Sequence, residues 1–247
     1  MTDDLGHSAG ITFLQQTQLQ RDTIRSAPRP FFGTVPPFKS YPQAEKFILP
    51  RTSWNLSEAR ILKLLQRRRS VRHYGIDPIA LEDLAVILWA IQGVTARAGT
   101  HLLRTSPSAG ALYPIETYIS IQRVVSLAPG LYHFDVQSFQ LALLTPGCQG
   151  DKIAEAFLGQ SFLDHAAICL IWSAVTRRSM GKYGDRAVRY LLLDAAHICQ
   201  NALLAAEALD LGACPAAAFY DQEVNRLLGI DGIEEAALYG AAIGRKR

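Results

Sequence analysis

The stretch from Tyr183 to Leu209 constrains the fold most, because it predicts one long helix that is apolar on most of its faces. A helix of this kind is stable only where other elements surround it. It also carries charged and polar residues at intervals, namely Arg189, Asp194, His197, Gln200, Asn201 and Glu207. No apolar run therefore approaches the ~18 residues of a membrane-spanning helix. The stretch predicts the core helix of a globular domain.

The composition fits a domain with an ample core, since 49% of the 247 residues are hydrophobic and 19% are charged. A formal net charge of +3 is too small for the basic surface that nucleic-acid binding needs, and it does not suggest a membrane surface. The first residues, "MTDDLGHSAG", are acidic and polar, whereas a signal peptide begins basic and continues apolar. We therefore expect a cytoplasmic protein that binds neither nucleic acid nor membranes.

The cysteines and histidines form no metal-binding pattern. Four cysteines lack any Cys-x-x-Cys pair and have apolar or small neighbours, which predicts buried, reduced thiols: Cys148, Cys169, Cys199 and Cys214. Four dispersed histidines lack ligand spacing and are interpreted as structural: His101, His133, His165 and His197. The sequence also has no Walker loop and no nucleophile elbow, which disfavours a hydrolase or a nucleotide triphosphatase.

Residues 1–50 differ from the rest of the chain, because prolines interrupt every periodic pattern after one short candidate helix, Ile11 to Ile24. The region is also rich in aromatic residues: Phe31, Phe32, Phe38, Tyr41 and Phe47. It is too aromatic for a solvated linker, so we expect an extended arm that lies on its own domain or on a partner subunit. Residues 51–247 form one predicted domain.

From Ser57 onward the sequence predicts helices and short strands in turn. Helical spacing of leucines and isoleucines indicates two amphipathic helices, around Leu62 and from Leu81 to Ile91. Three adjacent strands follow, "ETYISIQ", "LYHFD" and "FQLALL". Beyond them we expect a helix from residue 151 to 158, a buried strand "HAAICLIWS", the long helix, a strand or loop "GACPAAAF", a helix opened by an Asp221 cap, and a closing strand "EAALYGAAIG". Adjacent strands in the middle favour an α+β fold over a regularly alternating parallel one.

The segment "RTSPSAGALYPIE", Arg104 to Glu116, places prolines, serines and Gly110 directly before the first of these strands. Such residues break helices, set turn geometry and let a ligand approach the backbone. By itself the segment fits either a plain connection or the floor of a binding site.

Two basic clusters lie far apart in the sequence. "RRRSVR" puts four arginines and Ser70 at the C-terminal end of a helix, which fits either a cap that complements the helix dipole or a clamp for phosphate or carboxylate. The last residues, Arg245 to Arg247, would alone be a solvated tail. Because a phosphate monoester carries close to two negative charges, the two clusters together could bind one.

Lys182 and Tyr183 lie between two glycines in "GKYGDRAVRY", just before the long helix. They fit either a loop anchored by a tyrosine or an acid/base pair. In the second case the neighbouring arginines, Arg177, Arg178 and Arg186, would disfavour another positive charge and so favour the neutral, basic form of the lysine.

Five motifs, in their order along the chain, resemble the nitroreductase superfamily: "RRSVRHY", "PSAGALYPIETY", "PGLYHFD", "GKYGDRAVRYLLLDAAHICQNALLAAEALDLG" and "EAALYGAAIG". Within that superfamily the chain is similar to the SagB-type dehydrogenases, which include azoline oxidases. The similarity extends from Ser57 to the end of the sequence.

The resemblance implies a three-layer α+β sandwich, with a mostly antiparallel central sheet flanked by helices, and a homodimer that binds FMN at the subunit interface. The first motif implies contacts of Arg69, Ser70 and Arg72 with the phosphate and the ring edge. The second implies a loop against the isoalloxazine ring, made of Pro107, Ser108, Ala109 and Gly110. The long helix implies Asn201 as a polar residue near the flavin, and the C-terminus offers Arg245 and Arg247 as a second phosphate clamp.

The resemblance also implies a reaction, because azoline dehydrogenases carry a Lys-Tyr pair where this chain has Lys182 and Tyr183. In such enzymes a base takes a proton from a thiazoline or oxazoline while hydride passes to flavin N5, and dioxygen reoxidises the flavin. The substrate would be a peptide or a small natural product, with a cyclodehydratase as a candidate partner. Two alternatives stay open: an NAD(P)H-dependent nitro or quinone reductase, and a non-catalytic flavoprotein scaffold in a biosynthetic complex.

Overall fold

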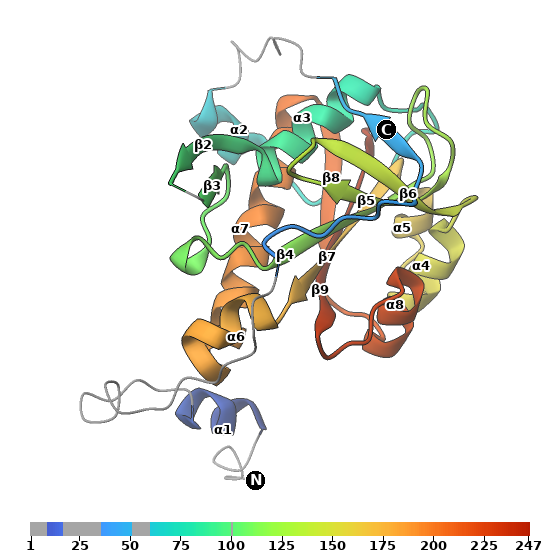
Figure 1. Cartoon of the computed structure of the whole chain (residues 1–247). Helices are drawn as coiled ribbons and strands as arrows, with labels where there is room; N and C mark the ends of the chain where they lie inside the picture. Colours follow the sequence, from blue (N-terminus) through green and yellow to red (C-terminus); the bar gives the residue numbers. More distant parts are fainter. Residues whose placement is uncertain (1–8, 17–35, 51–59, 100) are drawn as a thin grey trace, which may run out of the picture.

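The structure, a computed structural model, describes residues 9–16, 36–50, 60–99 and 101–247 (Figure 1). Some sequence expectations fall outside these residues. The candidate helix that begins at Ile11 is described only as α1 (Ala9–Gln16). The start predicted near Ser57 is not described, and α2 (Ile61–Arg67) begins beyond it. The arm residues Phe31 and Phe32 also lie outside the described part.

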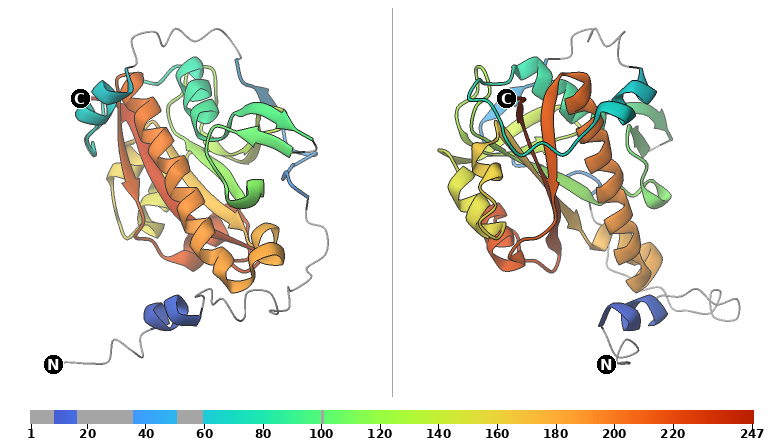
Figure 2. Two further views of the ribbon diagram at one scale, coloured as in Figure 1. Left: turned by 90° about the vertical axis from the view of Figure 1, so that its left-hand side faces the viewer. Right: turned by 180° about the vertical axis from the view of Figure 1, so that it is seen from behind.

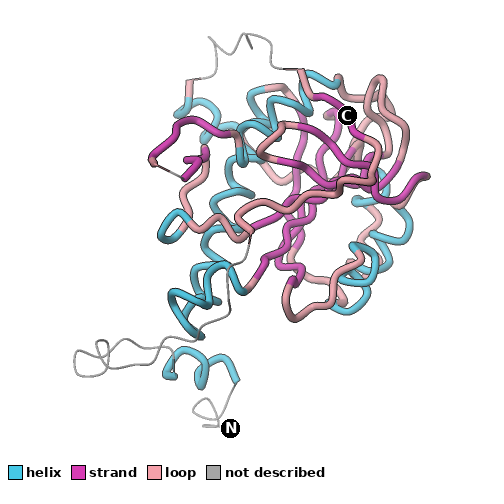
Figure 3. Tube along the Cα trace, in the orientation of Figure 1, coloured by secondary structure: helices cyan, strands magenta, loops and turns pink. Residues whose placement is uncertain are grey.

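A seven-stranded sheet forms the centre of the fold (Figure 3), and all neighbouring strands in it are antiparallel. The strand order is β1-β6-β5-β4-β7-β9-β8. The strands span Lys46–Ile48 (β1), Ile115–Ile121 (β4), Gly130–Asp135 (β5), Gln140–Pro146 (β6), Ile168–Val175 (β7), Leu211–Ala216 (β8) and Glu235–Arg245 (β9). The predicted strands are confirmed, and "GACPAAAF", which sequence left as a strand or a loop, contributes β8.

Helices cover both faces of the sheet, so the fold has three layers (Figure 2). On one face α3 (Leu81–Gln92) packs against α7 (Ala187–Ala208), and their apolar side chains join those of the sheet in one core cluster. On the other face α4 (Gly150–Ala156), α5 (Phe162–His165) and α8 (Asp221–Leu228) form a second cluster. The predicted α+β class, an antiparallel sheet flanked by helices, is confirmed.

Strand β4 is buried along its whole length, because a helical layer covers each of its faces. Its polar residues therefore need internal partners. Thr117 Oγ1 donates to Gln92 Oε1 at 2.9 Å, and Glu116 binds His133 and Arg178. In a half-exposed strand the polar residues of "ETYISIQ" would face water. Here Glu116 and Thr117 form hydrogen bonds that hold the strand to its neighbours.

The long apolar helix differs from the prediction in two ways. It is not continuous from Tyr183, because α6 (Arg177–Tyr183) ends there and Gly184, at φ +55°, separates it from α7. Its apolar surface is also not fully covered by the described residues. Val188, Leu192 and Leu193 are 37%, 50% and 55% exposed.

Several local expectations are wrong. The structure has a hairpin of β2 (Val94–Ala98) and β3 (His101–Arg104) that the sequence pattern did not predict. Helix α8 has Tyr220 at its N-cap position with no capping side-chain hydrogen bond, so the predicted cap, Asp221, lies in the first turn. Cys148 is exposed, whereas the other three cysteines are buried and free as predicted.

The described end of the arm lies on its own domain, one of the two surfaces that the sequence left open. Strand β1 pairs with β6 at the edge of the sheet. Lys39 Nζ donates to Tyr118 Oη at 2.7 Å and forms an ion pair with Glu235, while Tyr41 Oη lies 3.1 Å from Tyr118 Oη. Residues 46–48 thus belong to the sheet and Lys39 and Tyr41 are bound to it, while the domain boundary at residue 50 stays a prediction.

Candidate functional site

Gly110 and the Lys182-Tyr183 pair lie in direct contact, although 71 residues separate Gly110 from Lys182. A Cβ atom on Gly110 would lie 2.6 Å from Lys182 Nζ and 2.5 Å from Tyr183 Oη, so only glycine fits there without displacing these groups. Lys182 is exposed and Tyr183 is half-buried. The structure therefore joins two predicted parts of the site, the loop and the acid/base pair, at a solvent-accessible place.

The loop that contains Gly110, residues 107–113, has an unusual backbone. Gly110, Ala111 and Tyr113 all adopt left-handed conformations, with φ of +65°, +54° and +46°. For a residue other than glycine this costs about 1–3 kcal/mol, and it persists only where the surroundings fix it. Strain of this kind is common where a backbone is shaped for a ligand.

Asp194, on the buried side of α7, holds the first half of the loop. Ser108 Oγ donates to Asp194 Oδ2 at 2.6 Å, and the Ala109 amide donates to Asp194 Oδ1 at 3.3 Å. Ser108 Oγ in turn accepts from the Tyr113 amide at 2.9 Å. Burial raises the pKa of Asp194, although both hydrogen bonds oppose that shift. Sequence reasoning missed Asp194, whose only signal was a carboxylate inside an apolar helix.

Two arginines hold the second half of the loop at Tyr113. The Arg104 amide donates to Tyr113 Oη at 3.1 Å, and the Arg104 guanidinium lies 4.7 Å from the centre of the Tyr113 ring. Arg178 Nη1 donates to the Tyr113 carbonyl at 3.3 Å. Burial lowers the pKa of Arg104 to about 10, although the carboxylate of Glu116 opposes the shift. Among the described residues, Arg104 Nε has no hydrogen-bond partner.

Two of the three arginines beside the Lys182-Tyr183 pair form ion pairs, which weakens the positive environment that the sequence suggested. Arg178 forms a buried ion pair with Glu116, and Arg177 forms an ion pair with Glu234. Their charges are therefore largely balanced by carboxylates. Arg186 Nε donates to Tyr190 Oη at 2.8 Å.

Asn201 reaches the segment that leads into the loop. Its Nδ2 donates to the Ala90 carbonyl at 2.9 Å and to Ser106 Oγ at 3.0 Å, and Ser106 Oγ donates to the Ile91 carbonyl. Asn201 thus ties α7 to the end of α3 and to the residue before Pro107. Pro107 itself is exposed.

The structure brings only some of the predicted phosphate contacts together. Arg72 and Arg247 line one pocket of about 260 Å³. Ser70 lies on the same exposed segment, beside β8, where Ser70 and Ala213 form a parallel bridge. Arg69 folds back on α2, with Nη1 donating to the Gln66 and Arg68 carbonyls.

Arg245 turns away from this pocket toward α3. Its guanidinium pairs with Asp83 at 3.3 Å and donates to the Pro78 carbonyl. Lys246, between the two predicted arginines, pairs with Glu207 and Asp210 at the C-terminal end of α7. Of the two C-terminal arginines, only Arg247 meets Arg72.

The loop and the basic C-terminus contact α7 at different places along the helix. Asp194 contacts the loop, and Glu207 contacts Lys246 at 3.2 Å. Thirteen positions separate the two carboxylates on the helix, which is about 20 Å at 1.5 Å per residue. Within one chain the loop is therefore separate from the pocket of Arg72 and Arg247, and Asn201 lies on α7 between the two carboxylates.

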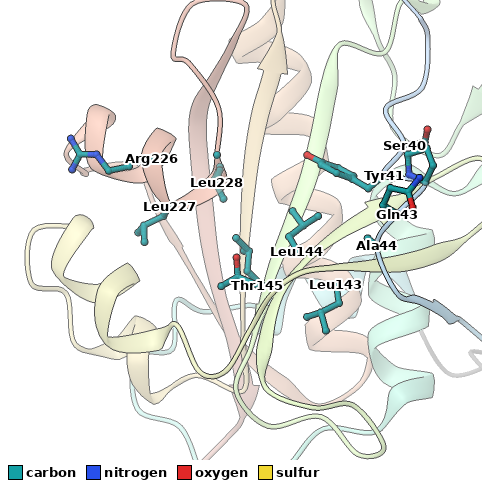
Figure 4. A pocket seen from close by; sticks show the side chains of 13 residues that line it. Ser40, Tyr41, Gln43, Ala44, Leu143, Leu144, Thr145, Arg226, Leu227 and Leu228 are labelled. Carbon is teal, nitrogen blue, oxygen red and sulfur yellow. The ribbon is translucent and has the colours of Figure 1, made fainter.

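A hollow on another side of the sheet brings none of these residues together. It has a volume of about 700 Å³ and lies between the arm, strand β6 and helix α8 (Figure 4). Leucines form much of its wall, among them Leu143, Leu144 and Leu227.

Within the described residues, no three His, Cys, Asp or Glu side chains are grouped to hold a metal ion. No described helix is long and apolar enough to cross a membrane.

The fold and the loop against α6 define the chain as a nitroreductase-like α+β protein. Residues 65–245 match the nitroreductase family, and the chain belongs to that family. Membership implies a flavin-dependent oxidoreductase. A nitroreductase-named protein of Methanocaldococcus jannaschii, MJ1384, is 36% identical over 192 residues, which are 78% of this chain and 94% of that protein. The trifolitoxin-processing protein TfxB of Rhizobium leguminosarum bv. trifolii is 27% identical over 152 residues, which are 60% of this chain and 41% of TfxB.

Solved structures show the same fold. A nitroreductase-type structure from Anabaena variabilis has a TM-score of 0.76 at 26% identity and covers 96% of this chain, which spans 47% of that longer chain. One from Ralstonia eutropha has a TM-score of 0.69 at 22% identity, over 88% of this chain and 97% of that chain. The E. coli microcin synthetase McbBCD complex includes a chain with a TM-score of 0.61 at 18% identity, over 96% of this chain and 86% of its own. At these lower identities the likeness concerns the fold alone.

Proposed function

We propose that the protein is an FMN-dependent oxidoreductase that dehydrogenates an azoline ring in a peptide or a small natural product. The observation that carries this proposal is the contact of Lys182 Nζ and Tyr183 Oη with Gly110. That contact puts a candidate base and a candidate hydroxyl donor directly against a backbone shaped to approach a flat ring.

The residues present fit a flavin mononucleotide. The loop offers small side chains, Ser108 to Ala111, and a glycine where a Cβ atom would fill the space beside the catalytic pair. Arg72 and Arg247 offer donors of the kind that bind a phosphate monoester. When bound, the flavin supplies the two-electron acceptor for a hydride from the substrate, and dioxygen reoxidises it.

In the proposed reaction Lys182 is the base. Its side chain takes the proton from a ring carbon of the azoline, while the hydride passes from the neighbouring ring atom to the flavin, so that the ring becomes an aromatic azole. Tyr183 donates a hydrogen bond at the same place. Its ring packs edge-on against Tyr190 at a centroid distance of 4.8 Å, which restrains the hydroxyl.

A homodimer would complete the site. The loop and the Arg72-Arg247 pocket belong to two separate groups within one chain, so a second copy could supply the half that each group lacks. The exposed apolar face of α7 supports this, because Val188, Leu192 and Leu193 form a surface that water solvates poorly. Leu62 of α2, a helix that contacts α7, is also 77% exposed.

The substrate class is supported by one relative. TfxB is named as a protein that processes trifolitoxin, and it is 27% identical to this chain over the aligned region. By analogy we propose a peptide substrate, and a cyclodehydratase that forms the azoline as a partner. A second candidate function is reduction of nitro or quinone compounds by NAD(P)H. The nitroreductase name of the more similar M. jannaschii protein favours it.

Two measurements on the purified protein test the proposal. A flavin absorbance spectrum of the bound cofactor is expected, and a colourless protein that takes up no FMN would contradict it. The bound flavin should bleach under anaerobic conditions when an azoline peptide is added. If NAD(P)H bleaches it rapidly and azolines do not, the reductase function is correct instead.

A further inference from the structure

Residues 36–41 of the arm contact the two arginines that hold the loop at Tyr113. The arm runs from α6 to the edge of the sheet, where β1 pairs with β6 (Figure 1). Pro36 contributes its carbonyl to these contacts, and Phe38 contributes its ring. The sequence predicted that the arm lies on a protein surface, but not which residues it contacts there.

Tyr113 is the residue of the loop that most needs support, because it is not a glycine and has a φ of +46°. Its ring and hydroxyl contact Arg104, and its carbonyl accepts from Arg178 Nη1 at 3.3 Å. The side chains of both arginines are buried. The position of Tyr113 therefore depends on where these two guanidinium groups are held.

The arm contacts both guanidinium groups. The centre of the Phe38 ring lies 5.4 Å from Arg104 Cζ, within the ~6 Å range of a cation–π contact. The Pro36 carbonyl accepts from Arg178 Nε at 2.9 Å. Arg104 thus joins the arm to Tyr113 through two aromatic rings, and Arg178 joins them through two carbonyls.

The arm is itself fixed directly after Phe38. Lys39 forms an ion pair with Glu235 and donates to Tyr118 Oη at 2.7 Å. Tyr41 Oη lies 3.1 Å from the same hydroxyl. Because the next residue is bound to the sheet, the ring of Phe38 is held over Arg104 as a fixed support.

We infer that Phe38 is a positioning residue of the site, which acts through Arg104 on Tyr113, and that Pro36 supports the same residue through Arg178. The inference rests on the proposed function, in which this loop holds the flavin ring beside Lys182 and Tyr183. It gives the arm a role in the reaction, although none of its described residues contacts that pair in the contacts above.

The test compares two identical substitutions on the arm, Phe38→Leu and Phe47→Leu. Phe47 is half-buried like Phe38, but it packs on Tyr132 at a centroid distance of 5.6 Å and contacts neither arginine. It is therefore a matched control for loss of an aromatic ring. Phe38→Tyr keeps the ring face over Arg104 and should restore the wild-type behaviour.

The first readout needs neither flavin nor substrate. Hydrogen exchange of the amides of residues 107–113 is measured in the apoprotein. In Phe38→Leu we expect exchange about fivefold faster than in the wild type, since the loop loses one of its supports. Phe38→Tyr and Phe47→Leu should exchange at the wild-type rate. Unchanged exchange in Phe38→Leu, or an equal rise in Phe47→Leu, would overturn the inference.

The second readout separates positioning from binding. With FMN bound, Phe38→Leu should reduce the flavin about tenfold more slowly at a saturating azoline peptide, with KM within about twofold of the wild-type value. An undiminished rate would overturn the role of Phe38 in the reaction. If loop exchange rises in Phe38→Leu but the wild type oxidises no azoline, the proposed function fails and the support of the loop by the arm stands.

A further pair of variants tests the link through Arg178. Arg178→Lys keeps the charge, but one ammonium group cannot reproduce the guanidinium fork that binds two carbonyls. Arg177→Lys is the control, because Arg177 pairs with Glu234 at the surface. Exchange should rise in residues 36–41 and in residues 107–113 for Arg178→Lys alone. A rise in neither segment, or the same rise in both variants, would overturn this link.

Discussion

Ser108 Oγ donates a 2.6 Å hydrogen bond to Asp194 Oδ2, and this bond joins the strained 107–113 loop to the core helix α7. The same carboxylate accepts from the Ala109 amide. One side chain thus holds the backbone directly before Gly110. The loop keeps its left-handed residues because α7 supplies the acceptors.

Asp194→Ala should loosen the loop, because Ser108 and Ala109 both lose their acceptor. We expect the free energy of unfolding to fall by about 1–3 kcal/mol and FMN to bind more weakly. Asp194→Asn keeps one acceptor oxygen, so its stability and its FMN affinity should lie between those of the wild type and the alanine variant. Urea denaturation and FMN titration measure the two effects. Wild-type FMN affinity in the alanine variant would show that Asp194 does not position the loop.

Gly110→Ala should impair catalysis by displacing Lys182 Nζ and Tyr183 Oη, which lie closer to the new Cβ than contact allows. The backbone adds about 1–2 kcal/mol of strain at φ +65°. Gly159→Ala is the matched control, since Gly159 has φ +70° and no atom within 4 Å of its Cβ position. Both variants should lose similar stability, and only Gly110→Ala should lose activity. Equal activity in the two variants would show that catalysis does not depend on the contact of Gly110 with Lys182 and Tyr183.

Glu116 should make the fold sensitive to acid. Burial alone would raise its pKa, but hydrogen bonding to His133 and the charge of Arg178 hold it below the ordinary value of 4.5. Because the folded-state pKa is depressed, the stabilisation is present above pH 4.5 and is lost as the pH falls through the folded-state value. Glu116→Gln should lack this dependence.

At neutral pH the same variant should be destabilised by about 3–5 kcal/mol, because it leaves the buried Arg178 without its carboxylate. Urea denaturation at a series of pH values checks both effects, with the exposed Glu223→Gln as control. A Glu116→Gln protein that loses stability in acid as steeply as the wild type would contradict the assignment.

Leu192→Glu should disrupt the proposed homodimer, because it puts a charge on the exposed apolar face of α7. Size-exclusion chromatography should show a monomer with reduced FMN binding. Ile233→Glu, at a residue that is 78% exposed elsewhere on the chain, should leave the assembly unchanged. A dimer of undiminished stability in the α7 variant would place the interface on another surface.

The sequence predicted those elements whose pattern follows directly from burial. Strands β4 to β7 were found because apolar residues dominate them, and α3 was found from its helical spacing. The hairpin of β2 and β3 was missed because all five residues of β2 are exposed, so no alternation marks it. The break at Gly184 was missed because the residues on both sides suit a helix.

For the site, the sequence identified residue types but not their partners. It suggested that Arg177 and Arg178 act on Lys182, whereas pairing with Glu234 and Glu116 is a tertiary property that spacing cannot reveal. Asp194 was missed for the same reason, since it is a single residue that matters through what the fold puts beside it. The cofactor roles taken from the motifs stay predictions.

The most direct test of the account follows flavin reduction in a single anaerobic turnover with an azoline substrate. Lys182→Ala should bind FMN as tightly as the wild type, but reduction should slow by about a hundredfold or more, as loss of a general base does. Lys152→Ala, at an exposed lysine on α4, should react at the wild-type rate. Undiminished flavin reduction in Lys182→Ala would contradict the central claim.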